Sequence, residues 1–433
     1  MRILIVGNGA RESALALKLK GDSRISKMYF AKGTVTTGQL GQNVYEESVE
    51  GLRDFAIKER IDLTIVGPEA PLVEGIVDEF KRHDLKIFGP GKRAAELEGS
   101  KAFSKKFMQT NNIKTAKAVV FDAYHDAVDY VRKQKFPIVI KASGLAGGKG
   151  VVIAENLAEA ESTIHKFMID RIYGDAGIQL VIEEYLNGFE ASIIAFSNGT
   201  KLFPCIPVKD YKKAGNGDSG PNTGGMGSVA PSPEFTDEHY RDFEINILAP
   251  TLAGLNKANI HFKGFIFFGL MVTQDGTFLL EYNMRMGDPE TQVILPLMEN
   301  KLFDVINDCL EGKEINLKFK DEKAVCLVMC SGGYPRKIET GFEIRNLNKI
   351  KNSQILFAGA KTAGDRILTS GGRVLSLVAT ADTYDQARKM VYEDAKTISF
   401  DYESYREDIL LSPFSFRASA DSRAPFPTIN ILI

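Results

Sequence analysis

The sequence predicts a multidomain protein of α/β and α+β class, with an N-terminal parallel α/β domain, a central domain of mixed strands and a C-terminal β-rich domain. Three observations lead to this prediction. Apolar strands, glycine turns and amphipathic helices alternate regularly over the first hundred residues, as they do in a parallel sheet. The alternation becomes irregular after Lys101, and strand-like segments dominate from about Lys323. A chain of 433 residues is long enough for about two to four domains.

The first domain is expected to repeat a strand–turn–helix plan. The opening RILIVG reads as a buried strand, and GNGARESALALKLK reads as a glycine turn that enters an amphipathic helix. The segment IDLTIVGPEAPLVEGIVDEFKRH repeats this plan before KIFGP. A helix over about 101–111 then leads into the next unit.

The first turn, Gly7-x-Gly9, lies between a strand and a helix but does not fit a dinucleotide fingerprint. Glu12 occupies the third glycine position, and a carboxylate there would repel a pyrophosphate. Backbone N–H groups at the helix start could still bind one phosphate or a sugar, with Arg11 assisting and Glu12 accepting hydrogen bonds. The alternative is a tight turn with Arg11 and Glu12 in solvent.

The segment 137–154, PIVIKASGLAGGKGVVIA, joins two apolar strands by a glycine-rich loop with a lysine at each end. Glycines let the backbone approach anionic oxygens, and Lys141 and Lys149 supply positive charge. It is not a Walker loop, because Gly150 and a β-rich run follow the second lysine. The segment therefore predicts a cover for nucleotide phosphates. The alternative is a flexible hairpin turn with two solvated lysines.

The next strands, QLVIEEYL, EASIIAFS and KLFPCIPV, are expected to be antiparallel or mixed. The first ends at 183–186 in the manner of a hinge between two lobes, where exposed backbone can contact adenine. Glu190 could take ribose hydroxyls. The alternative is a strand end with solvated acids. The glycine-rich stretch from Lys213 to Ser228 is long enough to be functional or disordered.

A hairpin is expected at Gln274-Asp275-Gly276. In its second strand, Glu281, Asn283 and Arg285 alternate and so point to one face. Oxygen ligands on one face suit Mg²⁺, which takes one or two protein oxygens plus nucleotide phosphates, and Arg285 could hold another anion. The polar turn GDPETQ could line the same site. The alternative is the solvent face of a sheet.

From about Lys323, the segments AVCLVMC, QILFAGA and GGRVLSLVAT predict strands, and a helix is expected near 384–398. Residues after Leu411 lose all periodicity. They predict a disordered or non-native extension.

Composition excludes several classes of function. The 54 Lys and Arg nearly balance the 56 Asp and Glu, so no global field attracts nucleic acid or a membrane. The four cysteines lack C-x-x-C spacing and the five histidines are scattered, so neither a disulfide framework nor a zinc site is indicated. No signal peptide or membrane span is recognisable, and a cytoplasmic location is expected.

The order and wording of these segments resemble the phosphoribosylamine–glycine ligase family, the glycinamide ribonucleotide synthetases of the ATP-grasp superfamily. The likeness runs from Met1 to about Leu411 and is carried by GNGARE, LEGSKAFSK, PIVIKASGLAGGKGVV, VIEEYL, GDSGPNTGGMGS, EYNMRMGDPETQ, TSGGRVL and YREDI. It implies an α/β substrate domain over 1–103, an ATP-grasp domain over 104–322 with a mobile small lobe at about 117–188, and a β-rich domain over 323–411. Residues 412–433 remain as the tail.

The resemblance also implies ligation of glycine to 5-phosphoribosylamine through glycyl phosphate, in a monomer or weak homodimer. ATP would contact Lys101, Lys141, Gly144, Gly148, Lys149, Glu183, Glu184, Tyr185, Leu186 and Glu190. Mg²⁺, with Mn²⁺ as an alternative, would bind Glu281 and Asn283. The small substrates would contact Gly9, Arg11, Glu12, Pro68, Glu69, Asp218, Thr223, Gly224, Arg285, Asp288, Pro289 and Glu290. Catalysis would involve Lys141, Lys149, Arg285, Asp218 and Asn222.

The sequence departs from the usual family wording at several positions, which include Ser13, Lys32, Thr34 and Ser143. The first three bear on how the phosphoribosyl group is held, and Ser143 bears on the mobility of the glycine loop. Two other classes remain open at this point. One is a sister ATP-grasp ligase or carboxylase with a different acceptor, and the other is a nucleotide-binding protein without catalysis.

Overall fold

The structure, a computed structural model, describes residues 1–411. Its N-terminal domain is a five-stranded parallel sheet in the order β3-β2-β1-β4-β5. The strands are β1 (Arg2–Gly7), β2 (Lys27–Lys32), β3 (Gln42–Val44), β4 (Leu63–Val66) and β5 (Ile87–Phe88). The helices are α1 (Ala10–Leu19), α2 (Val35–Leu40), α3 (Val49–Lys58), α4 (Glu69–Glu74), α5 (Ile76–Arg82) and α6 (Lys92–Gly99). Ile3 to Val6 are buried in β1, as expected for a strand covered on both faces.

A small lobe follows helix α7 (Lys101–Thr110). Its antiparallel sheet has the order β6-β9-β7-β8. The strands are β6 (Ala118–Phe121), β7 (Ile138–Ala142), β8 (Val151–Ala154) and β9 (Leu180–Glu184). Helices α8 (Tyr124–Val131) and α9 (Leu157–Met168) and the turn η1 (Gly174–Gly177) complete the lobe. Apolar residues of both helices share one core with β7 and β9.

The large lobe is built on a four-stranded antiparallel sheet in the order β11-β10-β16-β17. The strands are β10 (Phe189–Asn198), β11 (Leu202–Pro204), β16 (Lys263–Thr273) and β17 (Gly276–Asn283). Strands β16 and β17 form the hairpin that the sequence predicts. The helices of this region are α10 (Asp237–Phe243), the π-turn η3 (Glu244–Leu248), α11 (Ala249–Lys257), α12 (Thr291–Leu297) and α13 (Leu302–Glu311).

The C-terminal sheet combines strands from both sides of position 323. Its antiparallel order is β12-β15-β18-β22-β19. The strands are β12 (Lys209–Asp210), β15 (Gly227–Ala230), β18 (Lys323–Cys330), β19 (Gln354–Phe357) and β22 (Arg373–Ala381), and helix α14 (Tyr384–Ala395) and the turn η4 (Leu347–Lys349) accompany them. The pairing of β15 with β18 therefore fixes the segment around 209–230 to the C-terminal domain.

Two small hairpins complete the structure. One joins β13 (Lys213–Gly215) to β14 (Ser219–Asn222) through η2 (Asn216–Asp218), and the other joins β20 (Ala360–Ala363) to β21 (Arg366–Thr369). The first lies in the glycine-rich stretch 213–228, which is therefore ordered as a hairpin followed by a turn and β15. The sequence pattern did not predict the second.

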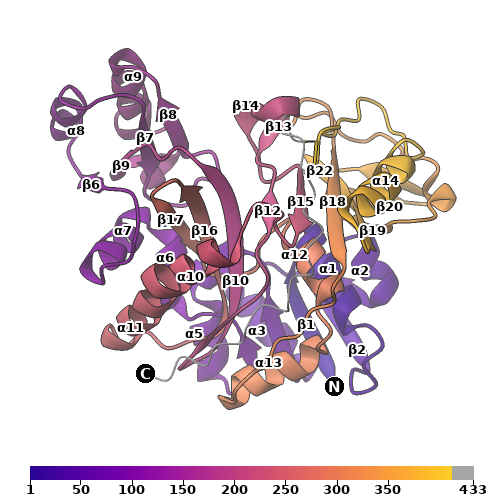
Figure 1. Cartoon of the computed structure of the whole chain (residues 1–433). Coiled ribbons are helices and arrows are strands. Elements are labelled where there is room, and N and C mark those ends of the chain that lie inside the picture. Colours follow the sequence, from indigo (N-terminus) through magenta and orange to yellow (C-terminus); the bar gives the residue numbers. More distant parts are fainter. Residues whose placement is uncertain (412–433) are drawn as a thin grey trace.

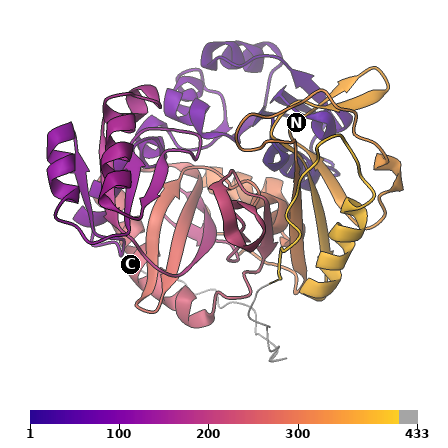
Figure 2. The same cartoon turned by 90° about the horizontal axis from the view of Figure 1, so that it is seen from above.

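Figures 1 and 2 show the small lobe and the C-terminal domain on opposite sides of the molecule. The predicted fold class is confirmed. In the described part of the chain, no helix combines the length and apolar character needed to cross a membrane. The predicted extension, 412–433, lies outside the described residues.

The N-terminal and C-terminal domains meet at the hydroxyl of Ser13, which lies 2.9 Å from Thr34 Oγ1 and donates to the Phe357 carbonyl at 2.9 Å. Phe357 N donates to Thr36 Oγ1 at 2.9 Å. Ser13 and Thr34 thus contact each other, and the Ser13 side chain takes part in a joint between domains.

Candidate active site

Three of the predicted ATP residues, Lys101, Lys141 and Glu183, lie near the ends of α7, β7 and β9. The Glu183 carboxylate lies between two lysines, with Nζ of Lys141 at 2.9 Å and Nζ of Lys105 at 3.0 Å. All three side chains are buried. Burial alone would raise the pKa of Glu183, but the two lysines outweigh it and hold the pKa below its ordinary value. The carboxylate is therefore ionised.

This cluster corrects part of the sequence analysis. The alternative of solvated acids at the end of β9 is wrong for Glu183, which is 4% exposed. The alternative of a solvated strand end holds in part for the next two residues, because Glu184 is only partly buried and Tyr185 is 41% exposed. Glu184 Oε1 accepts a hydrogen bond from Lys117 N at 2.8 Å. Sequence reasoning missed Lys105, although it is the last residue of the segment LEGSKAFSK that carries the resemblance.

The glycine-rich loop between β7 and β8 begins beside Lys101. Lys101 N donates to the Ser143 carbonyl at 2.7 Å, and Ser143 Oγ accepts from Ala102 N at 3.1 Å. Lys101 Nζ lies 3.5 Å from the Gly144 carbonyl. Burial lowers the pKa of Lys101, with the nearby Lys141 acting in the same direction. The alternative of two solvated lysines is wrong for Lys141, which is 6% exposed.

The far end of the loop is open. Lys149 is exposed, and Tyr173 OH donates to its carbonyl at 2.7 Å. Gly147 and Gly148 have φ of 56° and 75°, a region that L side chains rarely adopt. No heavy atom lies within 4 Å of a Cβ built at either position. The loop can therefore move without breaking side-chain packing at these two residues.

Glu281 and Asn283 lie at the end of β17, and both are partly buried. Burial would raise the pKa of Glu281, but Lys212, Lys101, Lys141 and Arg285 lower it below its ordinary value. An ionised carboxylate beside an amide oxygen fits a hard cation that takes its remaining ligands from phosphates and water. Among residues 1–411, no group of three or more His, Cys, Asp or Glu is arranged to hold a metal by itself.

Arg285 lies in a bend two residues after the end of β17, outside the strand that the sequence predicted for it, and bridges to the N-terminal domain. Its Nη2 lies 3.0 Å from Glu98 Oε1, and its Nε lies 3.4 Å from Glu69 Oε2. Glu98 Oε2 also accepts from Met284 N at 2.6 Å. Burial raises the pKa of Glu98 to about 7 despite the nearby Arg285. Glu98 has no place in the sequence prediction, although it belongs to the LEGS segment that carries the resemblance.

The N-terminal turn places Arg11 and Glu12 inside the protein. They are 7% and 0% exposed, so the alternative of solvated side chains is wrong. Glu12 Oε2 accepts from Gly9 N at 2.6 Å, and Arg11 Nε lies 2.6 Å from Glu12 Oε1. Arg11 also donates to the Met286 carbonyl at 3.2 Å. Glu12 therefore caps its own helix and orients Arg11 toward the segment after β17.

The turn GDPETQ lies against both the N-terminal and the C-terminal domains. Asp288 forms an ion pair with Arg373 at 3.2 Å and accepts from Gln292 at 2.7 Å. Although burial would raise the pKa of Asp288, Arg373 and Arg11 hold it below its ordinary value. Glu290 is buried 3.4 Å from Ser192 Oγ. Burial, together with the charge of Asp210, raises the pKa of Glu290 to about 7.

Other predicted residues engage partners that the sequence did not indicate. Glu190, expected near the ribose, forms an ion pair with Lys212. Thr223 Oγ1 donates to the Lys212 carbonyl at 2.8 Å. Asp218 forms an ion pair with Arg406.

Three family models match the chain: the N domain of phosphoribosylglycinamide synthetase over 1–98, its ATP-grasp (A) domain over 99–291 and, after a gap, its C domain over 324–411. The chain belongs to the phosphoribosylglycinamide synthetase family. This confirms the resemblance found in the sequence.

Relatives of the family agree with this assignment, and a more distant structure shares the fold. Phosphoribosylamine–glycine ligases from Clostridium acetobutylicum and Fusobacterium nucleatum are 47% and 46% identical, and each match covers 94% of this chain and 99% or 98% of the relative. A phosphoribosylamine–glycine ligase structure from Thermotoga maritima has a TM-score of 0.81 at 33% identity, covering 94% of this chain and 100% of that one. A biotin carboxylase domain of a 2-oxoglutarate carboxylase from Hydrogenobacter thermophilus, at 15% identity and TM-score 0.72, covers 92% of this chain and 90% of its own and shares the fold.

Several of the predicted residues gather in two neighbourhoods, while Lys149, Glu190, Asp218 and Thr223 lie apart from them. Lys101, Lys141 and Glu183 lie around the end of β7, and Glu281 is coupled electrostatically to both lysines. Gly9, Arg11 and Glu12 lie with Asp288 at the junction of three domains, where a Cβ on Gly9 would be 3.0 Å from the Asp288 carboxylate. Pro68 and Glu69 start α4 next to Arg285. Arg285 therefore stands between the two neighbourhoods.

Proposed function

We propose that this chain joins glycine to 5-phosphoribosylamine with cleavage of ATP to ADP and phosphate, and so makes glycinamide ribonucleotide for purine biosynthesis. One observation carries the proposal: the ionised Glu281, the cations Lys101 and Lys141, and Arg285 surround the end of one strand, beside the turn GDPETQ. This arrangement suits two anions that react with each other, namely the γ-phosphate of ATP and the carboxylate of glycine. The names of relatives at 40–47% identity point to the same reaction.

The nucleotide is assigned to Lys101, Lys141 and Lys149 for the phosphates and to 183–186 for adenine. Glu190 is assigned to the ribose. Its ion pair with Lys212 would have to open when the nucleotide binds. Glu281 and Asn283 would hold Mg²⁺, or Mn²⁺ as an alternative. The ion supplies neutralisation of the charge on the transferring phosphoryl group. Because Asn283 Oδ1 lies 3.5 Å from Arg285 Nη2, the amide oxygen is already oriented toward the site.

Glycine is assigned to Arg285 and to the backbone of the PNTGGMG turn, and 5-phosphoribosylamine to Gly9, Arg11, Pro68, Glu69 and the turn 288–290. A glycine carboxylate oxygen attacks the γ-phosphorus, and ADP leaves. The amine of 5-phosphoribosylamine then attacks the carbonyl carbon of glycyl phosphate, and inorganic phosphate leaves. No protein nucleophile is needed. The loop 144–150 excludes water from the acyl phosphate.

The first test is ADP release from the purified protein with glycine and freshly generated 5-phosphoribosylamine. ADP should form only when both small substrates are present. ADP formation with bicarbonate or another carboxylate in place of glycine would contradict the proposal. It would indicate an enzyme that phosphorylates a different carboxylate.

Isotope labelling tests the intermediate. Glycine carrying ¹⁸O in both carboxylate oxygens should transfer one label to the released inorganic phosphate, because the oxygen that attacks phosphorus leaves with it. Label in AMP would indicate an adenylate, and unlabelled phosphate during turnover would rule out glycyl phosphate. A cytoplasmic location and a monomer or weak homodimer remain predictions.

A further inference from the structure

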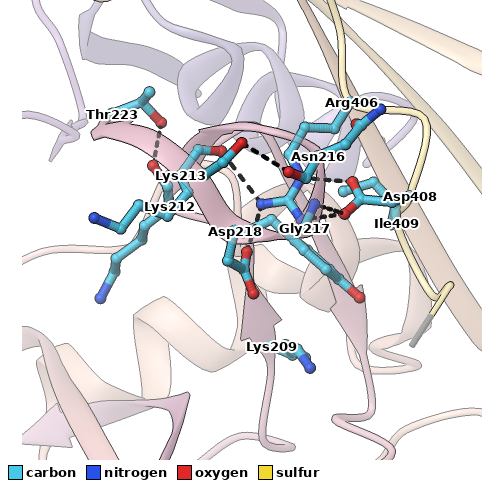
Figure 3. A network of polar contacts seen from close by, with 12 residues as sticks. Lys209, Lys212, Lys213, Asn216, Gly217, Asp218, Thr223, Arg406, Asp408 and Ile409 are labelled. Atoms are coloured by element: carbon cyan, nitrogen blue, oxygen red, sulfur yellow. Dashed lines mark hydrogen bonds and ion pairs between the residues drawn. The ribbon is translucent and has the colours of Figure 1, made fainter. Parts of the chain in front are cut away.

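The C-terminal segment 404–411 contacts the tip of the β13–β14 hairpin (Figure 3). Arg406 lies at the centre of this contact and is 1% exposed. Its Nη1 donates to Asp218 Oδ1 at 2.6 Å and to the Lys213 carbonyl at 3.3 Å. Its other nitrogens form a two-point contact with the Asp408 carboxylate, at 2.7 and 2.6 Å. One guanidinium group therefore joins the hairpin to the C-terminal segment.

The contact is reinforced by two backbone groups. Gly217 N donates to Asp408 Oδ2 at 2.7 Å, and Glu407 N donates to Asn216 Oδ1 at 3.0 Å. Gly217 and Asp218 have φ of 64° and 52°. Aspartate tolerates this left-handed conformation better than most residues other than glycine. The ion pair with Arg406 fixes the Asp218 side chain at the tip of the hairpin.

Arg406 is itself held rigidly. Its guanidinium group lies over the Tyr211 ring, 5.0 Å from the ring centroid, and Tyr392 OH donates to its carbonyl at 2.7 Å. Tyr211 OH accepts from Leu410 N at 2.9 Å. A buried arginine with this many fixed contacts is suited to position another segment, because its planar group loses little further entropy.

The other end of the same loop is fixed by a second arginine of the C-terminal domain. Arg373 Nη1 donates to the Gly224 carbonyl at 2.7 Å and to the Asp288 carbonyl at 2.8 Å. Tyr334 OH accepts from Gly224 N at 2.9 Å. Arg373 therefore links the PNTGGMG turn to the GDPETQ turn.

We propose that Arg406 and Arg373 are positioning residues that hold the loop 213–227 at its hairpin tip and at its PNTGGMG turn, so that its backbone is already arranged when glycine binds. The inference rests on the proposed function and adds to it a role for the C-terminal domain. The isolated two-stranded hairpin would be marginally stable, and β14 is exposed along its whole length. Its order therefore depends on the contacts at its ends.

The first test is hydrogen exchange without substrates, so that it does not depend on the reaction. Arg406→Lys keeps the charge but cannot contact both carboxylates at once. Asp218→Asn removes the exposed half of the pair and leaves Arg406 with Asp408. In both variants the amides of 213–222 should exchange faster than in the wild-type chain. The exchange rates in β18 and β22 should be unchanged. Unchanged exchange at 213–222 in both variants would overturn the proposal.

The second test separates positioning from general damage. In Arg406→Lys, which changes no residue assigned to substrate, the KM for glycine should rise by about tenfold, the scale of one lost charge-assisted hydrogen bond, while the KM for ATP should stay within about twofold. A parallel rise in both KM values would overturn the proposal. Asp401→Asn is the matched control, because Asp401 forms an exposed ion pair with Arg345 in the same domain. If the wild-type chain does not ligate glycine, the proposed function fails, while the exchange measurement still decides whether Arg406 orders the loop.

Discussion

At the scale of single residues, Glu281 has the most direct assignment, because four cations keep its carboxylate ionised. Glu281→Gln preserves the side-chain volume and removes the charge that would bind Mg²⁺. We expect kcat to fall by about 100-fold or more, the size of effect seen when one group that stabilises charge is removed from an active site. The chain should stay folded, but its melting temperature should fall, because the charged carboxylate offsets four nearby cations in the folded protein. Near-normal turnover at modest Mg²⁺ would refute the metal assignment.

Lys141 has two roles that a pair of variants can separate. Lys141→Ala should raise the Kd for ATP, because a charge is removed from the phosphates. It also leaves the buried Glu183 with Lys105 as its one cation, and breaking a buried pair destabilises by about 3 kcal/mol. Lys149→Ala should raise the Kd with little change in stability, since Lys149 is exposed. Calorimetry and urea unfolding give the two readouts, and equal stability loss in both variants would contradict the distinction.

Glu98 should make stability depend on pH. Burial raises its pKa from 4.5 to about 7 in the folded protein, so between these values the folded state binds a proton that the unfolded state has released. Its contribution to stability is complete below pH 4.5 and is lost as the pH rises through 7, by up to about 3 kcal/mol. Glu98→Gln keeps the acceptor for Met284 N and should flatten this decline. An unchanged slope of unfolding free energy from pH 5 to 7.5 would contradict the assigned pKa.

At the scale of elements, the loop between β7 and β8 depends on the left-handed conformation of Gly148, where a Cβ would meet no other atom. Gly148→Ala should therefore strain the backbone by about 1 kcal/mol without a clash. We expect a lower kcat, because the loop closes less often. Gly364→Ala is the matched control, since Gly364 has φ of 61° and equally open surroundings outside the site. A loss of activity in the control equal to that in Gly148→Ala would mean that the loop has no special role.

At the scale of the whole molecule, the three matched family domains end at residue 411. The segment 412–433 shows no apolar periodicity and carries no motif. Deleting it should leave both ligation and the melting temperature unchanged. Loss of either would show that the segment contributes to the folded protein.

The sequence by itself determined the elements and the motifs that a short stretch of chain encodes. The parallel plan of β1 and β4, the lysine–glycine hairpin and the alternation of Glu281, Asn283 and Arg285 are visible because strand and helix periodicity and turn chemistry act over a few residues. The resemblance of these motifs to those of a known family then predicted an activity.

Only the tertiary structure decided which residues complete the site. Glu98 reaches Met284 and Arg285 across 186 and 187 positions, and Arg406 reaches Asp218 across 188. No local pattern specifies such pairs, because each side chain alone looks like an ordinary charged residue of a helix or loop. Burial removes these charged groups from water, so each must be paired with an opposite charge or a hydrogen-bond partner. The packing of domains that are distant in the sequence determines which partner lies within reach.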